Sequence, residues 1–151
     1  ESNKPLYAFG YGLSYTTFKL NNLQLNKTEL ATNDTVQISV DVSNTGQMAG
    51  DEVVQLYIQD LFASITRPVQ DLKGFKRLHL TPGETKTVTF TVAASQFGFY
   101  DANMDFIVEP GTIRLMLGTS SDDLPLQADI EVVGETAVVT NKTFFSKITV
   151  N

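Results

Sequence analysis

Residues 36–43, with the sequence VQISVDVS, decide the fold class of this chain. Their apolar residues alternate with polar ones, and successive side chains of a β-strand point to opposite faces of a sheet. The stretch therefore predicts a strand with one buried and one exposed face. Four further stretches show the same alternation at their apolar positions: Val54, Leu56 and Ile58; Val88, Phe90 and Val92; Ile113, Leu115 and Leu117; Leu126, Ala128, Ile130 and Val132.

Turn-forming sequences separate these strands. They read NTG at 44–46, TPGE at 81–84 and EPG at 109–111. Glycine tolerates a positive φ and proline presets the first residue of a turn, so each is typical of a chain reversal. No stretch shows the 3.6-residue apolar repeat of a helix. The sequence therefore predicts an all-β fold, an antiparallel β-sandwich.

Composition narrows the functional classes. The chain has 151 residues, 42% of them hydrophobic and 19% charged, which is typical of one packed domain. It has no cysteine, which excludes disulfides and a cysteine nucleophile. With a net charge of −6 and only 11 Lys and Arg, it lacks a basic surface for nucleic acid, and no apolar run is long enough to cross a membrane.

Two segments do not fit a simple succession of strands. Residues 1–17 are rich in aromatic residues and glycine, and residues 60–73 form a long connection of the kind that a compact domain keeps when it has a use. We therefore divide the chain into a leading segment (1–17), a sandwich (18–134) and a C-terminal extension (135–151) that adds an edge strand.

Candidate catalytic and metal-binding patterns are incomplete. His79 is the single histidine, and alternation places it with Arg77 on the exposed face of a strand. Residues 101–105, DANMD, begin like a calcium loop, but Phe106 and Thr112 stand where glycine and glutamate are needed, so a polar turn is the better interpretation. Adjacent acidic residues, as at 51–52 and 122–123, point to opposite sides and do not form the convergent pair of a glycosidase. We expect no catalytic residue, metal or cofactor.

Five motifs, in order along residues 5–134, carry a family resemblance. They are FGYGLSYTTF at 9–18, NTG at 44–46 with GDEVVQLYI at 50–58, LKGFKR at 72–77 with PGE at 82–84, VEPG at 108–111, and GTSSD at 118–122. This series is similar to the C-terminal fibronectin type III-like domain of family 3 glycoside hydrolases. One departure is Phe106, where the family often has tryptophan.

The resemblance implies an immunoglobulin-like, fibronectin type III-like sandwich that is an accessory domain of a β-glucosidase or β-xylosidase. In that family the catalytic residues belong to an upstream barrel and an α/β domain, so none is carried over to this chain. The implied partners are those catalytic domains of the same polypeptide, and the implied location is periplasmic or secreted.

Two functions remain open, together with a less favoured third. In the first, the domain docks on the catalytic domains and stabilises them through the two irregular segments, with these candidate contacts: Tyr7, Phe9, Tyr11, Phe62, Ile65 and Arg67. In the second, it binds a polysaccharide weakly, since stacking on sugars needs exposed aromatic rings. The chain has no tryptophan, and we expect most of its phenylalanines to point inward. A free adhesion module would instead predict tandem copies.

Overall fold

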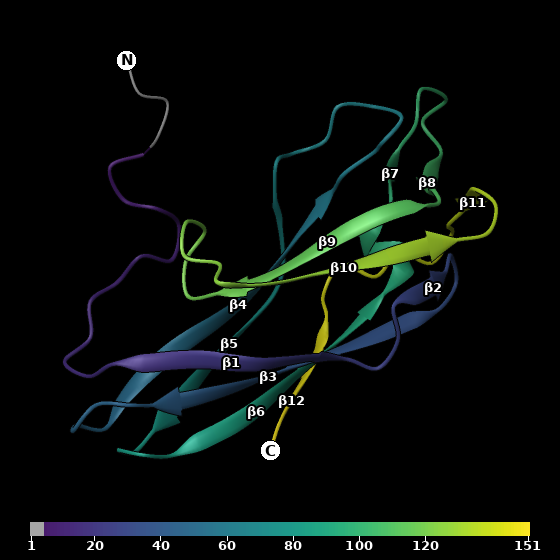
Figure 1. Ribbon diagram of the computed structural model, residues 1–151. Coiled ribbons are helices and arrows are strands. Elements are labelled where there is room, and N and C mark those ends of the chain that lie inside the picture. The colour runs from purple at the N-terminus through teal and green to yellow at the C-terminus, as the bar shows by residue number, and fades with distance from the viewer. Residues whose placement is uncertain (1–4) are drawn as a thin grey trace.

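Two β-sheets pack face to face in the computed structural model, which describes residues 5–151; the first four residues of the leading segment lie outside this range (Figure 1). One sheet has the strand order β1-β3-β6-β12, the other β2-β10-β9-β4-β5, and a small third sheet has the order β11-β8-β7. The strands are β1 (Phe18–Leu25), β2 (Glu29–Ala31), β3 (Thr35–Asn44), β4 (Gly50–Asp60), β5 (Asp71–Leu80), β6 (Thr85–Ala93), β7 (Phe99–Tyr100), β8 (Phe106–Val108), β9 (Gly111–Gly118), β10 (Leu126–Val133), β11 (Ala137–Val138) and β12 (Lys147–Val150). The all-β sandwich prediction is confirmed.

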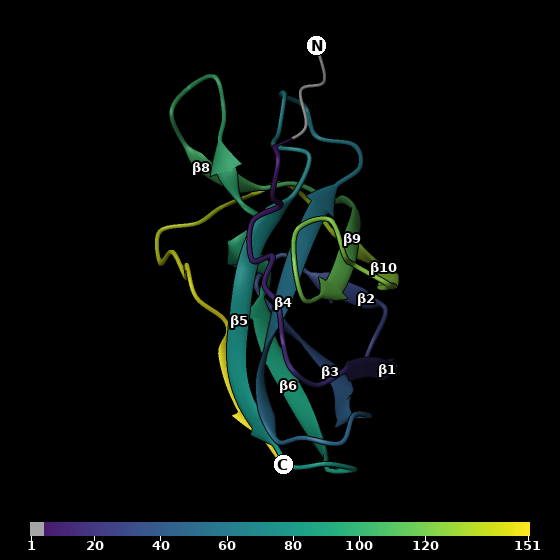
Figure 2. The same ribbon diagram turned by 90° about the vertical axis from the view of Figure 1, so that its left-hand side faces the viewer.

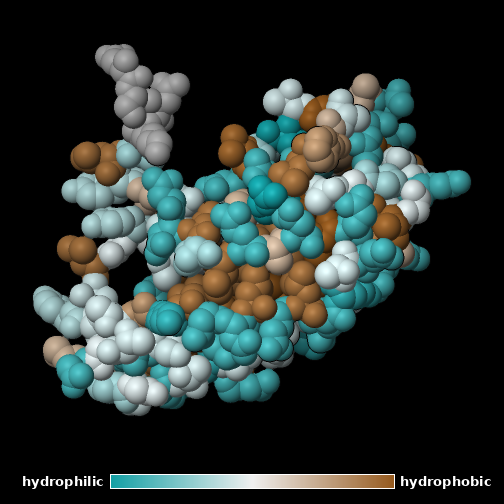
Figure 3. Space-filling model, viewed as in Figure 1, coloured by the Kyte–Doolittle hydropathy of each residue, from teal (hydrophilic) through white to brown (hydrophobic). Residues whose placement is uncertain are grey.

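The core lies where the alternating residues of β3 and β6 meet the second sheet. Ile38 of β3 is paired in register with Phe90 of β6, and both side chains are fully buried. Opposite them, Leu56 of β4 and Leu117 of β9 are also paired and fully buried. Hydrophobic residues fill the space between the sheet of β1 and the sheet of β10 (Figure 3).

Two local features differ from an all-strand, antiparallel meander. Residues Ala94–Phe97 form one turn of 3₁₀ helix, η1, after β6. The short strand β2 pairs with β10 in parallel, because the chain crosses from the first sheet to the second between β1 and β3. Both features are too short to show a periodic signal in the sequence.

Strand β4 is buried on both faces. Residues Val54–Ile58 are five consecutive buried positions, although alternation predicts that Gln55 and Tyr57 face solvent. The outer face of the five-stranded sheet is therefore covered at this point, and the segments that cover it are those of the candidate site.

The C-terminal residues complete the first sheet. Strand β12 pairs antiparallel with β6, and Ile148 packs against the core. Ahead of it, the backbone N–H and hydroxyl of Ser146 both lie against the carbonyl oxygen of Lys73, at 3.4 and 2.8 Å. The chain after residue 134 therefore forms part of the sandwich and ties its two sheets together.

Two turn glycines differ in what they require of the backbone. A Cβ atom added at Gly46 would lie 2.2 Å from Thr16 Oγ1, so the chain passes too close for a side chain. Gly83 has open space around it but a φ of +79°, which L-residues adopt at a cost.

We expect Gly46→Ala to lower the free energy of unfolding by about 1–3 kcal/mol, because the added methyl group overpacks the contact with Thr16. Gly83→Ala should cost about 1–2 kcal/mol, from backbone strain alone. Gly12→Ala is the matched control, since nothing lies within 4 Å of its Cβ position and its φ is unremarkable. Urea titrations of the three variants measure the difference; equal stability of all three would contradict the turn assignment.

Candidate interdomain docking site

Residues 5–17 of the leading segment cross the outer face of the five-stranded sheet in front of β4 and are anchored at two points (Figure 2). At the first anchor the Ser121 N–H donates to the Phe9 carbonyl oxygen, at 2.9 Å. Gly10 then sits on Gln55 so closely that a Cβ atom would lie 2.2 Å from its Nε2 atom. Beneath, Gln55 Nε2 donates to the Thr119 carbonyl (2.7 Å), and its Oε1 accepts from the hydroxyl of Tyr57 (2.6 Å). This anchor covers Gln55 on the outer face of β4.

The second anchor is at Thr16, where the leading segment joins β1. The buried Thr16 hydroxyl donates to Asn44 Oδ1, at 2.8 Å. The amide group of Asn44 in turn donates to the carbonyl oxygens of Met48 (2.8 Å) and Leu80 (2.9 Å). Asn44 belongs to the NTG turn, so the start of β1 and the turn after β3 are fixed together by one buried side chain.

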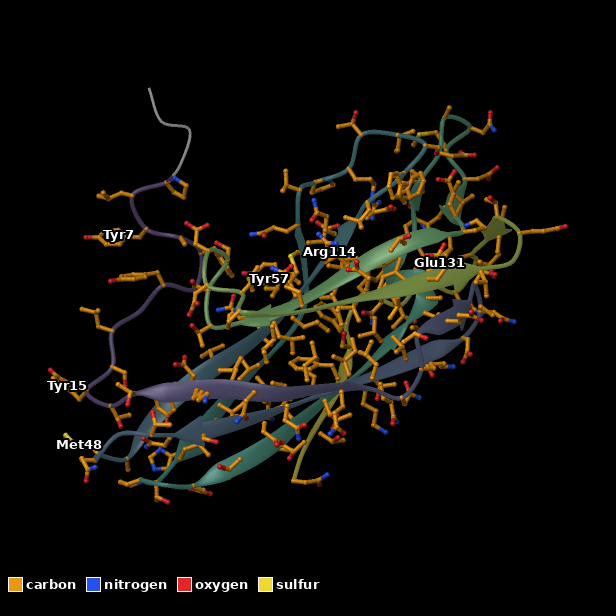
Figure 4. The ribbon with its side chains drawn as sticks, in the orientation of Figure 1. Tyr7, Tyr15, Met48, Tyr57, Arg114 and Glu131 are labelled. Atoms are coloured by element: carbon orange, nitrogen blue, oxygen red, sulfur yellow. The ribbon has the colours of Figure 1, made fainter. Side chains whose placement is uncertain are left out.

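Between and beside these anchors, the apolar side chains of the leading segment are exposed. The exposed residues are Leu6, Tyr7, Phe9, Tyr11, Leu13 and Tyr15. The rings of Tyr7 and Tyr11 stack with their centroids 5.5 Å apart. Tyr7 and Tyr15 point away from the sandwich (Figure 4). An anchored segment therefore presents a row of apolar side chains to the solvent.

The β4–β5 connection contains the other three candidates, which differ in their placement. Phe62 and Ile65 are exposed. The Arg67 side chain is only 12% exposed, and its guanidinium lies 4.8 Å from the ring centre of Phe99. It also donates to the carbonyl oxygens of Phe97 (3.2 Å) and Gly98 (3.4 Å). Arg67 therefore holds the connection in place and offers little surface to a partner, which differs from the role expected for it.

The two candidate segments lie at opposite ends of β9. Leu61 N–H donates to the carbonyl of Thr112, near the start of that strand, whereas Phe9 is bonded to Ser121, beyond its end. Phe62 and Tyr7 therefore do not belong to one patch.

Phe75 of β5 is a neighbouring apolar residue that was not among the predicted contacts. It is 61% exposed, and with Phe9 it lines a hollow of about 240 Å³. The expectation that most phenylalanines point inward is wrong, because five of the ten are exposed: Phe9, Phe62, Phe75, Phe144 and Phe145. The signal that could have revealed Phe75 is alternation, because it lies two residues before Arg77 and four before His79 and shares their exposed face.

The polar groups of the domain serve turns and strand pairs. His79 and Arg77 are exposed, as predicted, and both bind Asp51 on the adjacent strand, with 2.6 Å between His79 Nδ1 and Asp51 Oδ1. The Asp101 carboxylate accepts from the backbone N–H groups of Asn103 and Asp105, both at 2.9 Å, which closes the β7–β8 turn.

Among residues 5–151, no three His, Cys, Asp or Glu side chains are grouped to hold a metal ion. The described residues also contain no helix that could span a membrane.

Glu52 is an acidic residue whose surroundings disfavour its charged form. It lines a hollow of about 430 Å³ beneath residues 10–14, together with Asp123. Partial burial, and secondarily the charge of Asp123, raise the pKa of Glu52 above its ordinary value, although its Oε1 accepts from the Val53 N–H at 2.8 Å.

These features define a class: an immunoglobulin-like β-sandwich domain that carries an anchored apolar surface on the outside of one sheet. Within it, residues 52–121 match the family model described as a fibronectin type III-like domain. The chain belongs to the fibronectin type III-like domains of family 3 glycoside hydrolases, as the motifs indicated, and this domain is a non-catalytic part of those proteins.

The relatives are much longer than this chain. A β-xylosidase from Formosa agariphila is 49% identical over 122 residues, which are 80% of this chain and 17% of the relative. A periplasmic β-glucosidase from Salmonella typhimurium is 44% identical over 121 residues, again 80% of this chain and 16% of the relative. The crystal structure of a Listeria innocua β-glucosidase in complex with glucose superposes with a TM-score of 0.83 at 42% identity, covering 88% of this chain and 18% of that one. The chain thus spans about one sixth of the length of these relatives.

We expect Glu52→Gln to stabilise the domain at pH 7 and to have no effect near pH 4. The pKa of Glu52 is 4.5 in the unfolded chain and higher in the folded domain. Its protonated form therefore stabilises the folded state below pH 4.5, and this contribution is lost as the pH rises through the higher, folded-state pKa. Glutamine keeps the acceptor for Val53 and cannot ionise. Thermal melts of the wild type and of Glu52→Gln between pH 4 and 7 test this. The control is Asp122→Asn, which removes an exposed carboxylate in the turn between β9 and β10. A stability difference that does not change with pH would contradict it.

Proposed function

We propose that this domain is the non-catalytic accessory part of a glycosidase of the β-glucosidase or β-xylosidase type, and that it docks on the catalytic domains of the same polypeptide and stabilises them. The observation that supports this most is the leading segment, which is fixed at Gly10 and Thr16 yet exposes six large apolar side chains. A contiguous exposed apolar patch of this kind marks an interaction surface.

The anchoring bears on the strength of such a contact. Ordering a loop at the moment of binding consumes part of the interaction free energy. Here the hydrogen bonds at Phe9 and Thr16, and the stacking of Tyr7 on Tyr11, order the segment in advance. A partner joined through the same chain is also present at a high effective concentration, so a modest surface suffices for stable docking.

The same comparisons support a location outside the cytoplasm. One relative is named a periplasmic β-glucosidase and is 44% identical to this chain. The absence of cysteine from the sequence leaves the domain independent of the redox state of its compartment. We therefore place the protein in the periplasm or among secreted proteins.

Weak binding of a polysaccharide is the second candidate, and the exposed tyrosines of the leading segment favour it. Tyr7, Tyr11 and Tyr15 are of the residue type that stacks on sugar rings. However, Tyr7 and Tyr11 stack on each other, so one face of each ring is already covered, and the chain has no tryptophan. Docking accounts for the apolar Leu6 and Leu13 as well, so it is the function we favour.

The isolated chain should neither hydrolyse glycosides nor bind short oligosaccharides tightly. Glycoside hydrolysis needs an acid and a nucleophile that flank the bond, and the fibronectin type III-like domain is a non-catalytic part of the family's proteins. Release of the aryl group from aryl β-glucosides and β-xylosides should stay at background. Calorimetric titration with cello- and xylo-oligosaccharides should give a Kd weaker than about 10 μM. Turnover that follows the protein peak through repurification would overturn the accessory role, and tighter binding would favour the second candidate.

Docking is tested by Tyr7→Ser combined with Leu13→Ser in the full-length protein that contains this chain. Both side chains are exposed in the isolated domain, so the two substitutions should change its free energy of unfolding by no more than the roughly 0.5 kcal/mol usual for surface changes. The melting temperature of the isolated domain should therefore stay the same. The melting temperature of the full-length protein should fall, because the apolar contact is lost. Met104→Ser, at the exposed tip of the β7–β8 turn, is the control. No change in the full-length protein would refute docking through this segment.

A further inference from the structure

The apolar surface extends beyond the leading segment. We infer that one continuous strip runs from Phe9 across the outer face of β5 to the C-terminal segment before β12, and that it receives an apolar ridge of the upstream domain in two hollows on either side of Phe75. This inference rests on the proposed docking function and names the surface that performs it.

Phe75 and Leu72 form the wall between the two hollows. The first, of about 240 Å³, is closed on its other side by Phe9 and Val53. The second, of about 170 Å³, is closed by Phe144 and Phe145, which lie some 70 residues later in the sequence. Because Phe75 and Leu72 line both hollows, the strip is continuous from one end of the chain to the other.

The far end of the strip is held in place by hydrogen bonds. The Ser146 hydroxyl lies 2.8 Å from the Lys73 carbonyl oxygen and 3.0 Å from Gln96 Oε1, so it contacts β5 and η1 at once. Directly after it, β12 pairs with β6. Phe145 is nevertheless 86% exposed next to these anchors. Its exposure therefore results from the way the chain is fixed, as with the leading segment.

The lining of the hollows indicates the chemistry of the occupant. Among residues 5–151, Lys73 is the one charged residue in either lining. Burial lowers the pKa of Lys73, while the carboxylate of Asp71, 3.6 Å away, has the opposite effect. A saccharide needs several hydrogen-bonding partners, whereas an apolar protein ridge needs few. The strip therefore fits side chains such as leucine or phenylalanine from another protein surface.

The position of the strip identifies the partner as the upstream domain. The leading segment, β4 and β5 face the viewer in Figure 2, and the chain leading to β12 runs along the left edge of β5. A domain joined ahead of the leading segment is tethered on this side of the sandwich, where its effective concentration is highest.

The test uses Phe75→Ser with Phe145→Ser, compared with Met104→Ser and Val138→Ser as equally exposed controls outside the strip. In the full-length protein, amide hydrogen exchange of residues 72–75 should speed up by about tenfold or more in the strip variant, which corresponds to about 1.4 kcal/mol of lost protection. In the isolated chain the same amides should exchange at the wild-type rate, because no partner covers them. The controls should exchange like the wild type in both proteins.

Three other results would overturn the inference. If Tyr7→Ser with Leu13→Ser destabilises the full-length protein while the strip variant exchanges like the wild type, docking stands and the extended strip is refuted. If neither variant has an effect, both the docking function and the strip fail. A dimer of the isolated chain that the strip variant dissociates, measured by sedimentation, would assign the strip to a second copy instead.

Discussion

The burial of β4 on both faces is the constraint on which the rest of the structure depends. Its inward residues, such as Leu56, pack in the sandwich core, whereas its outward residues, Gln55 and Tyr57, are buried outside that core. A buried amide must find hydrogen-bond partners, and Gln55 finds them in Tyr57 and Thr119. Gly10 then covers the amide at a distance that no side chain permits. The path of the leading segment, and hence the position of its exposed aromatic rings, follows from covering this strand.

The sandwich was predictable because its central strands follow the period of two. In β3 and β6 the apolar residues alternate, and both strands bury that face completely. The motifs also indicated the domain family, and the structure exposes five of the six proposed contact residues. Arg67 is the sixth, and its side chain is largely buried, whereas an arginine in a long connection is usually solvated. Its partners are the carbonyl oxygens of Phe97 and Gly98, 30 residues further along the chain, which local pattern does not encode.

The apolar strip was also hidden from the sequence, for a geometric reason. The alternation that exposes Arg77 also exposes Phe75, but Leu72, three residues earlier, lines the same hollows only because the β4–β5 register shifts between these two residues. Phe145 lies in a segment without regular structure, and what it faces is decided by Ser146, whose hydroxyl bonds two elements distant in sequence. Surfaces assembled from separate parts of the chain become visible only once the fold is known.

The pairing of β12 with β6 also affects the solubility of the domain. Without residues 135–151, β6 would become the edge of its sheet, with the unpaired N–H and C=O groups of residues 88–91 open to other molecules. Those residues read VTFT, a β-branched and aromatic run without charge, which is the kind of edge that adds strands from neighbouring chains and aggregates. β12 itself begins with a lysine and is only four residues long, two common protections of a sheet edge. The C-terminal residues thus keep the sandwich from growing into a larger sheet.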